Sequence, residues 1–133
     1  MQDDSKQIES ASGKTSHLFD CGVFIDLNEE IARLFSSASV KEESGRNSKM
    51  LAKFPEFRIV LVTMRAKSRW DDHKTPSRIF VQVLRGKIQF HTPGRTFQVG
   101  CGQLLALDPG ILHSVDCKED SAFLLTLSGA PSQ

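Results

Sequence analysis

Short hydrophobic or alternating runs dominate the chain after Met50. Gly, Pro, Asp and Asn separate these runs at intervals of roughly 8–12 residues, which is typical of an all-β domain. Phe57–Met64 is almost continuously apolar, as expected of a strand that is covered on both faces. Further strand-like runs are Ile79–Leu84, Lys87–Phe90, Thr96–Val99, Leu104–Leu107, Leu112–Val115 and Phe123–Leu127. We expect no helices between these runs, so the pattern predicts a sandwich or barrel of antiparallel strands.

Two neighbouring runs predict a hairpin. Lys87–Phe90 and Thr96–Val99 both alternate between apolar and polar residues. The sequence Thr92-Pro93-Gly94-Arg95 between them favours a tight turn, because proline and glycine suit its central positions.

One segment before the strands has helical periodicity. Within residues 26–35, the apolar side chains on one helical face are Leu27, Ile31, Leu34 and Phe35. Asp26 or Asn28 is placed to cap the first turn. We therefore predict a short amphipathic helix near the N-terminus.

The domain organisation follows from where the pattern changes. Residues 1–16 are polar and offer almost nothing to bury, so we expect a flexible N-terminal tail. Residues 17–50 would contain the helix and a surface loop at 41–49, which leads into the barrel. Residues 51–130 would form the barrel itself. A chain of 133 residues with 39% hydrophobic content suffices for one domain with a single core.

Charge and cysteine content narrow the function classes. Seventeen basic and sixteen acidic residues give a net charge of +1, which argues against binding to nucleic acid or to an anionic membrane. Cys21, Cys101 and Cys117 are an odd number without a CxxC spacing, so we expect reduced thiols. The polar first twenty residues do not have the pattern of a signal peptide. These features predict a cytoplasmic protein.

The span from about Arg58 to Leu127 contains residues that match two motifs of a known family. In the first motif a glycine, two histidines, a glutamate and a closing glycine follow at fixed spacing. With Gly86 as the closing glycine, His73 falls on the first histidine. Three positions depart from this motif, with Lys67 at the opening glycine, Thr75 at the second histidine and Ile79 at the glutamate.

The second motif matches more completely. Gly102, Gly110 and His113 stand at its two glycines and its histidine. Asp108 occupies the proline position and Cys117 the asparagine position. The span therefore resembles a small single-domain cupin of the cupin-2 type, an RmlC-like barrel.

The resemblance implies an all-β fold, an antiparallel cupin jelly-roll barrel preceded by the short helix. It also implies a homodimer and a pocket inside the barrel. Cupins with the full motif bind a divalent metal through three histidines and a glutamate, because imidazole and carboxylate suit iron, manganese, nickel or zinc. This chain keeps His73 and His113 of those four ligands. The sequence leaves open whether the protein binds one divalent metal (Fe, Ni, Mn or Zn) or no metal.

A metal at His73 and His113 would need a third donor. The candidates are Thr75, Gln82, His91 and Cys117. Strand alternation favours Cys117, because it lies on the same face as His113 if that strand continues. Alternation turns Gln82 away from the pocket, and the turn next to His91 predicts that this histidine is exposed.

We expect a ligand pocket lined by His73, Thr75, Ile79, Val81, His113 and Cys117. Three functions remain open. The first is binding of a small molecule between the two histidines and an apolar wall. The second is a metal-dependent oxygenase or isomerase that acts on an oxygenated small molecule. The third is a non-catalytic dimeric interaction or sensing module. Trp70 either stacks on a ligand in this pocket or packs within the barrel.

Overall fold

The computed structural model describes residues 16–37 and 44–129. The chain divides into two compact units, Met1–Ser36 and Ser37–Gln133. Of the expected tail at residues 1–16, all but Ser16 lies outside the described residues, as do residues 41–43 of the expected loop. No helix in the described part of the chain is long and apolar enough to cross a membrane.

The first unit contains a hairpin and the predicted helix. Strands β1 (Ser16–Phe19) and β2 (Gly22–Ile25) pair in antiparallel fashion, and helix α2 spans Leu27–Ser36. The backbone N–H of Glu29 donates to Asp26 Oδ1 at 3.2 Å, so Asp26 is the N-cap. The helix prediction is confirmed. The hairpin was not predicted, because its strands are only four residues long and lack a clear alternation.

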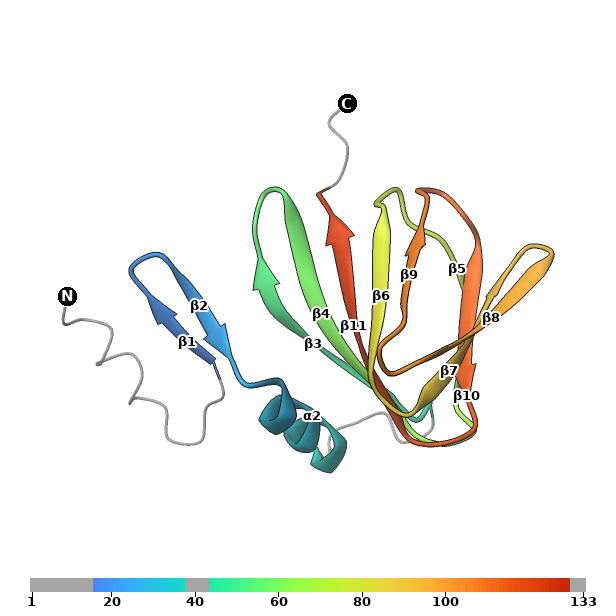
Figure 1. Cartoon of the computed structure of the whole chain (residues 1–133), viewed down its shortest axis with the longest axis horizontal. Helices are drawn as coiled ribbons and strands as arrows, with labels where there is room; N and C mark the ends of the chain where they lie inside the picture. Colours follow the sequence, from blue (N-terminus) through green and yellow to red (C-terminus); the bar gives the residue numbers. More distant parts are fainter. Residues whose placement is uncertain (1–15, 38–43, 130–133) are drawn as a thin grey trace. The chain divides into compact units, whose positions relative to one another are not determined.

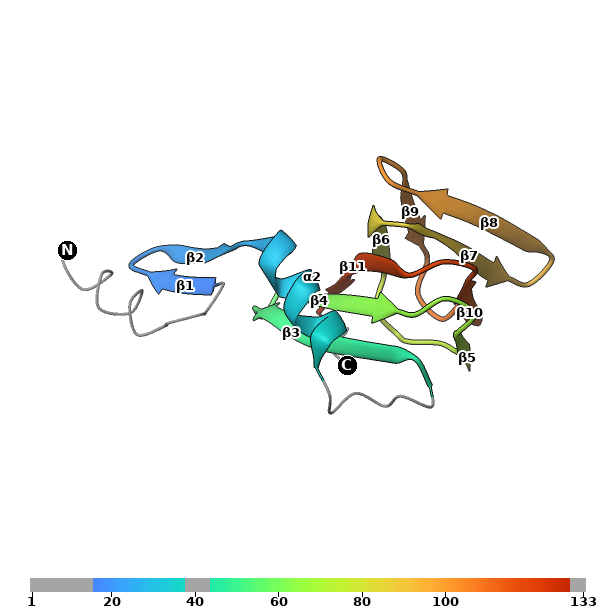
Figure 2. The same cartoon turned by 90° about the horizontal axis from the view of Figure 1, so that it is seen from below.

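The second unit is a jelly-roll barrel of two antiparallel sheets, which face each other in Figures 1 and 2. The larger sheet has the order β3-β4-β11-β6-β9 and the smaller one β5-β10-β7-β8. The strands are β3 (Arg46–Lys53), β4 (Phe57–Met64), β5 (Arg69–His73), β6 (Ile79–Arg85), β7 (Lys87–Thr92), β8 (Arg95–Gly100), β9 (Leu104–Leu107), β10 (His113–Cys117) and β11 (Ser121–Ser128). The predicted fold class is thereby confirmed.

The strands that the hydrophobic pattern predicts are all present, with each end within two residues of its predicted position. The pattern missed β3 and β5, and β3 begins inside the segment expected to be a loop. Both strands lie at the edge of their sheet. Edge strands carry polar and charged residues that discourage pairing with other chains, so their sequences resemble loops.

The core lies between the two sheets. It is built from the inward-facing residues of both, including Val62, Val81, Phe90, Val115 and Phe123. In β4, Leu61 and Val62 point to opposite faces and both are fully buried. The burial expected on both faces of this strand therefore holds for residues 61–64, whereas residues 57–60 are exposed or half-buried.

Gly86 shows why the closing glycine of the first motif is needed at the turn between β6 and β7. Its φ angle is +77°, in the left-handed region that glycine adopts without strain. A Cβ atom there would lie 2.4 Å from the carbonyl oxygen of Asp120 and 2.4 Å from Ser121 Oγ. The turn between β6 and β7 thus packs directly against the turn that precedes β11.

Candidate functional site

The site is centred on two histidines from neighbouring strands. His73 ends β5 and His113 begins β10, and the two residues are direct cross-strand partners. Their ring centroids are 4.1 Å apart and the ring planes meet at 64°. The bulge between His113 and Val115 in this pairing places one extra residue of β5 before His73. The structure therefore brings together the two imidazoles that the motif comparison selected.

Hydrogen bonds to the backbone fix the tautomer of both rings. His73 Nδ1 lies 2.9 Å from the carbonyl oxygen of Asp71, and His113 Nδ1 lies 2.9 Å from that of Ile111. A carbonyl oxygen only accepts, so Nδ1 carries the proton in each ring. In the neutral form, Nε2 of each ring is then a bare acceptor.

Burial keeps His113 neutral. Only 4% of the residue is exposed, and desolvation lowers its pKa below the ordinary value near 6.5, against the opposing effect of its hydrogen bond to Ile111. The nearby His73 also lowers the pKa of His113, and Asp72 raises it. At neutral pH His113 therefore presents an uncharged imidazole.

Aromatic side chains flank the histidine pair. Trp70 stacks on His73 with a centroid distance of 4.6 Å, and Phe90 stacks on His113 at 5.1 Å. The guanidinium carbon of Arg46 lies 4.4 Å from the Trp70 ring centroid. Trp70 thus packs against two other side chains of the barrel, and its stacking contact orients the His73 ring.

The other predicted pocket residues have different surroundings. Ile79 and Val81 are buried in the core cluster beside Phe90. Thr75 is half-buried, and its Oγ1 accepts a hydrogen bond from the backbone N–H of Ser77 at 3.2 Å. Thr75 thus stabilises the loop between β5 and β6.

Cys117 is buried, and its thiol donates to the carbonyl oxygen of Arg65 at 3.3 Å. Desolvation raises its pKa above the ordinary value, although hydrogen bonds with Ser68 and Ser121 oppose this. A protonated thiol directed at a backbone carbonyl is a poor metal ligand. The idea that Cys117 supplies the missing donor is not favoured by this geometry.

The model of the AraC-like ligand binding domain family matches residues 59–131, which is more than half of the chain. The chain belongs to this family. Its barrel is accordingly a ligand-binding domain of the cupin fold, which confirms the predicted family resemblance. No curated protein sequence matches the chain.

Solved structures similar to this ligand-binding domain share its fold. An RmlC-like cupin from Shewanella frigidimarina is 18% identical with a TM-score of 0.62, covering 67% of this chain and 80% of that one. A cupin 2 conserved barrel domain protein from Leptotrichia buccalis is 29% identical with a TM-score of 0.60, over 65% of this chain and 42% of that one. Salicylate 1,2-dioxygenase from Pseudoaminobacter salicylatoxidans, as a G106A mutant, is 12% identical with a TM-score of 0.69, over 80% of this chain and 34% of that one.

A divalent metal of the kind that cupins bind does not fit the donor set of this domain. Within residues 16–37 and 44–129, no group of three or more His, Cys, Asp or Glu side chains could hold a metal ion. The glutamate position holds Ile79, which is buried in the apolar core. Two imidazoles fall short of the three protein ligands that catalytic metal sites commonly use.

Sequence reasoning missed a polar network on the outer face of the smaller sheet. His91 Nε2 lies 2.6 Å from Asp116 Oδ2, and the Thr96 hydroxyl lies 2.8 Å from His91 Nδ1. Arg69 joins Asp116 at 3.3 Å and also binds Asp71 at 3.2 Å. The expectation that His91 is solvent-exposed holds only in part, because its hydrogen bonds to Thr96 and Asp116 leave 32% of the side chain exposed. Only the alternation of β7 and β10 could have indicated that His91 and Asp116 share a face.

Proposed function

We propose that this chain binds a small molecule at His73 and His113. One observation carries the proposal. Nε2 of each ring has no hydrogen-bond partner among the residues that the structure describes, although His113 is 96% buried. A buried acceptor without a partner costs about 1–3 kcal/mol, which a ligand that donates a hydrogen bond would recover.

The two acceptors suggest which ligand chemistry suits the site. Neighbouring bare nitrogens favour a molecule with two adjacent donors, such as two hydroxyl groups or an N–H and a hydroxyl group. Phe90, Ile79 and Val81 give the surrounding barrel an apolar character. Compact uncharged molecules with adjacent donors fit this combination better than carboxylates, which would place their oxygens against the nitrogen lone pairs.

A metal would depend on the ligand itself. The two imidazoles could hold a divalent ion only if the bound small molecule supplied further donor atoms. We therefore propose binding without a resident metal, with the oxygenase or isomerase reaction as the less supported alternative.

We also propose a homodimer in a reducing compartment. All three cysteines are free, which agrees with a cytoplasmic location. The outer face of the larger sheet exposes Phe80 and Leu104 at 37% and 64%. Large apolar residues exposed on one sheet face favour association of two copies.

A thermal-shift screen tests the ligand proposal. Uncharged polyhydroxy, phenolic and amide compounds are offered to the wild-type protein and to its His73→Gln and His113→Gln variants. We expect a compound that stabilises the wild type and loses that effect in both variants.

His91→Gln is the matched control for this screen, because it removes an imidazole from the outer face of the same barrel. A hit that stabilises all four proteins equally would contradict the site. His73 is less buried than His113, so its variant remains informative if His113→Gln unfolds.

A further inference from the structure

A polar hollow of about 350 Å³ lies on the outside of the barrel, away from the histidine pair. Its lining consists of Lys87, Gln89, Gln98, Lys118 and Glu119. The first two of these belong to β7, Gln98 belongs to β8, and the last two form the turn after β10. Its volume lies within the range of small-molecule pockets.

Strand alternation separates this hollow from the site inside the barrel. Ile88 and Phe90 of β7 point into the core, so Lys87 and Gln89 point outward. Gln89 is the direct cross-strand partner of Gln98, which places the two carboxamides next to each other on the outer face. The hollow and the histidine pair therefore lie on opposite faces of the same sheet.

The side chains that line the hollow differ from those of the polar network on the same outer face. Within the described part of the chain, none of its five lining side chains makes a hydrogen bond or an ion pair. The polar network beside it is different, because Asp116 there binds both Arg69 and His91. One half of the outer face is thus internally paired, while the other half keeps its donors available.

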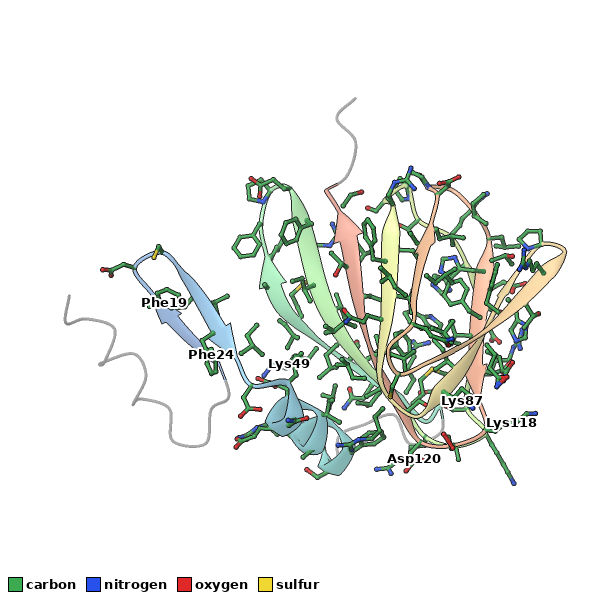
Figure 3. The ribbon with its side chains drawn as sticks, viewed as in Figure 1. Phe19, Phe24, Lys49, Lys87, Lys118 and Asp120 are labelled. Carbon is green, nitrogen blue, oxygen red and sulfur yellow. The ribbon has the colours of Figure 1, made fainter. Side chains whose placement is uncertain are left out.

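The charges in the hollow favour an anion. Figure 3 shows Lys87 and Lys118 at the same end of the barrel, and both line the hollow. Asp120, labelled beside them, accepts a hydrogen bond from the backbone N–H of Ala66 at 2.8 Å. Glu119 is then the one carboxylate among the lining residues, against two ammonium groups.

We propose that the hollow formed by Lys87, Gln89, Gln98 and Lys118 is a second binding site, which takes a small molecule bearing a carboxylate or phosphate group. The two ammonium groups bind the oxyanion, and the amide N–H groups of the two glutamines donate to its remaining oxygens. Glu119 also lines the hollow, where its carboxylate selects against ligands with excess negative charge. This site is independent of the proposed function of the histidine pair.

Titration followed by two-dimensional ¹H–¹⁵N NMR tests this site, with inorganic phosphate and malonate as separate probes. We expect saturable shifts of the backbone amides of the lining residues with at least one probe. The Lys87→Gln plus Lys118→Gln variant should bind about tenfold more weakly. Glu119→Gln should bind about twofold to threefold more tightly, because it removes a like charge. Comparison of the two probes assigns the preference to phosphate or to carboxylate.

The Lys53→Gln plus Arg58→Gln variant is the charge-matched control. These two residues are cross-strand partners in the larger sheet, so the variant loses the same charge away from the hollow. Its binding should equal that of the wild type. Absence of saturable shifts with both probes, or equal weakening in the two double variants, would overturn the second site. Substitution of His73 should leave this binding unchanged.

Discussion

At the scale of the residue, the two imidazoles of the site share one local arrangement. Each ring donates through Nδ1 to the carbonyl oxygen of the residue two positions earlier, Asp71 for His73 and Ile111 for His113. This contact orients the ring and leaves Nε2 as the functional atom. The sequence identified both histidines through motif spacing. It could not show their tautomers, because these depend on the backbone path before each ring.

The lowered pKa of His113 makes stability depend on pH. The unfolded chain takes up a proton near pH 6.5, whereas the folded chain does so only at lower pH. The free energy of unfolding should therefore decrease as the pH falls below about 6.5. Urea unfolding at about pH 7.5 and about pH 5.5 measures this change. His113→Gln should show a smaller loss between the two pH values, and an equal loss would refute the assignment.

The three thiols should differ in reactivity. Cys21 and Cys101 are exposed, whereas Cys117 is buried with a raised pKa. We expect a disulfide reagent to modify two thiols quickly in the native protein and the third only after denaturation. Mass spectrometry of the labelled peptides identifies the slow residue. Rapid native labelling of Cys117 would show that the carbonyl oxygens around it do not enclose the thiol.

At the scale of the element, tight turns and cross-strand hydrogen bonds position the strands of the smaller sheet. The turn from β6 to β7 contains Gly86, and the turn from β7 to β8 contains Gly94 with a φ of +78°. A Cβ atom at Gly94 would meet nothing within 4 Å, in contrast to the close contacts at Gly86. A substitution at Gly94 therefore introduces backbone strain alone, whereas a substitution at Gly86 introduces both backbone strain and steric overlap.

Alanine substitution at these glycines should give different losses. Gly94→Ala should lower the free energy of unfolding by about 1 kcal/mol, because it introduces strain at a positive φ alone. Gly86→Ala should cost about 3 kcal/mol or more, since it also forces the β6–β7 turn away from Ser121. Chemical unfolding of both variants measures the difference. Equal losses would mean that the neighbouring turn yields without cost.

The outer-face network links three strands through Asp116. This carboxylate of β10 binds Arg69 of β5 and His91 of β7, and 29% of its side chain is exposed. Asp116→Asn should lower the free energy of unfolding by about 1–2 kcal/mol. Asp71→Asn is the matched control, because Asp71 binds the same arginine with 90% of its side chain exposed and should cost less than about 0.5 kcal/mol. Equal costs would contradict a cross-strand role for Asp116.

At the scale of the whole molecule, the barrel assembles a two-histidine site inside and polar features outside. The motif comparison located the inner site, but its departures at Thr75, Ile79 and Cys117 could not be judged from spacing. In the structure Thr75 accepts a hydrogen bond within the β5–β6 loop, and Ile79 packs in the core. The thiol of Cys117 points at backbone carbonyl oxygens. Packing between the two sheets decided these outcomes.

The donor set predicts the metal content of the purified protein. Elemental analysis of untagged protein, prepared without chelator, should find no near-stoichiometric Fe, Ni, Mn or Zn. The His73→Ala plus His113→Ala variant should give the same result. Near-stoichiometric metal that disappears in this variant would support the metal-dependent reaction, with further donor atoms from a bound molecule or from residues outside the described ranges.

The sequence by itself determined the all-β class, most of the inner strands, the capped helix and the two histidines. It could do so because apolar alternation, turn residues and motif glycines are local signals. Only the tertiary structure decided that β3 and β5 form the edge strands. It also decided that Arg46 and His73 pack against Trp70, and that five polar side chains line the outer hollow. These depend on strand pairing between distant segments, and a shift of one residue in register would turn each side chain to the other face of its sheet.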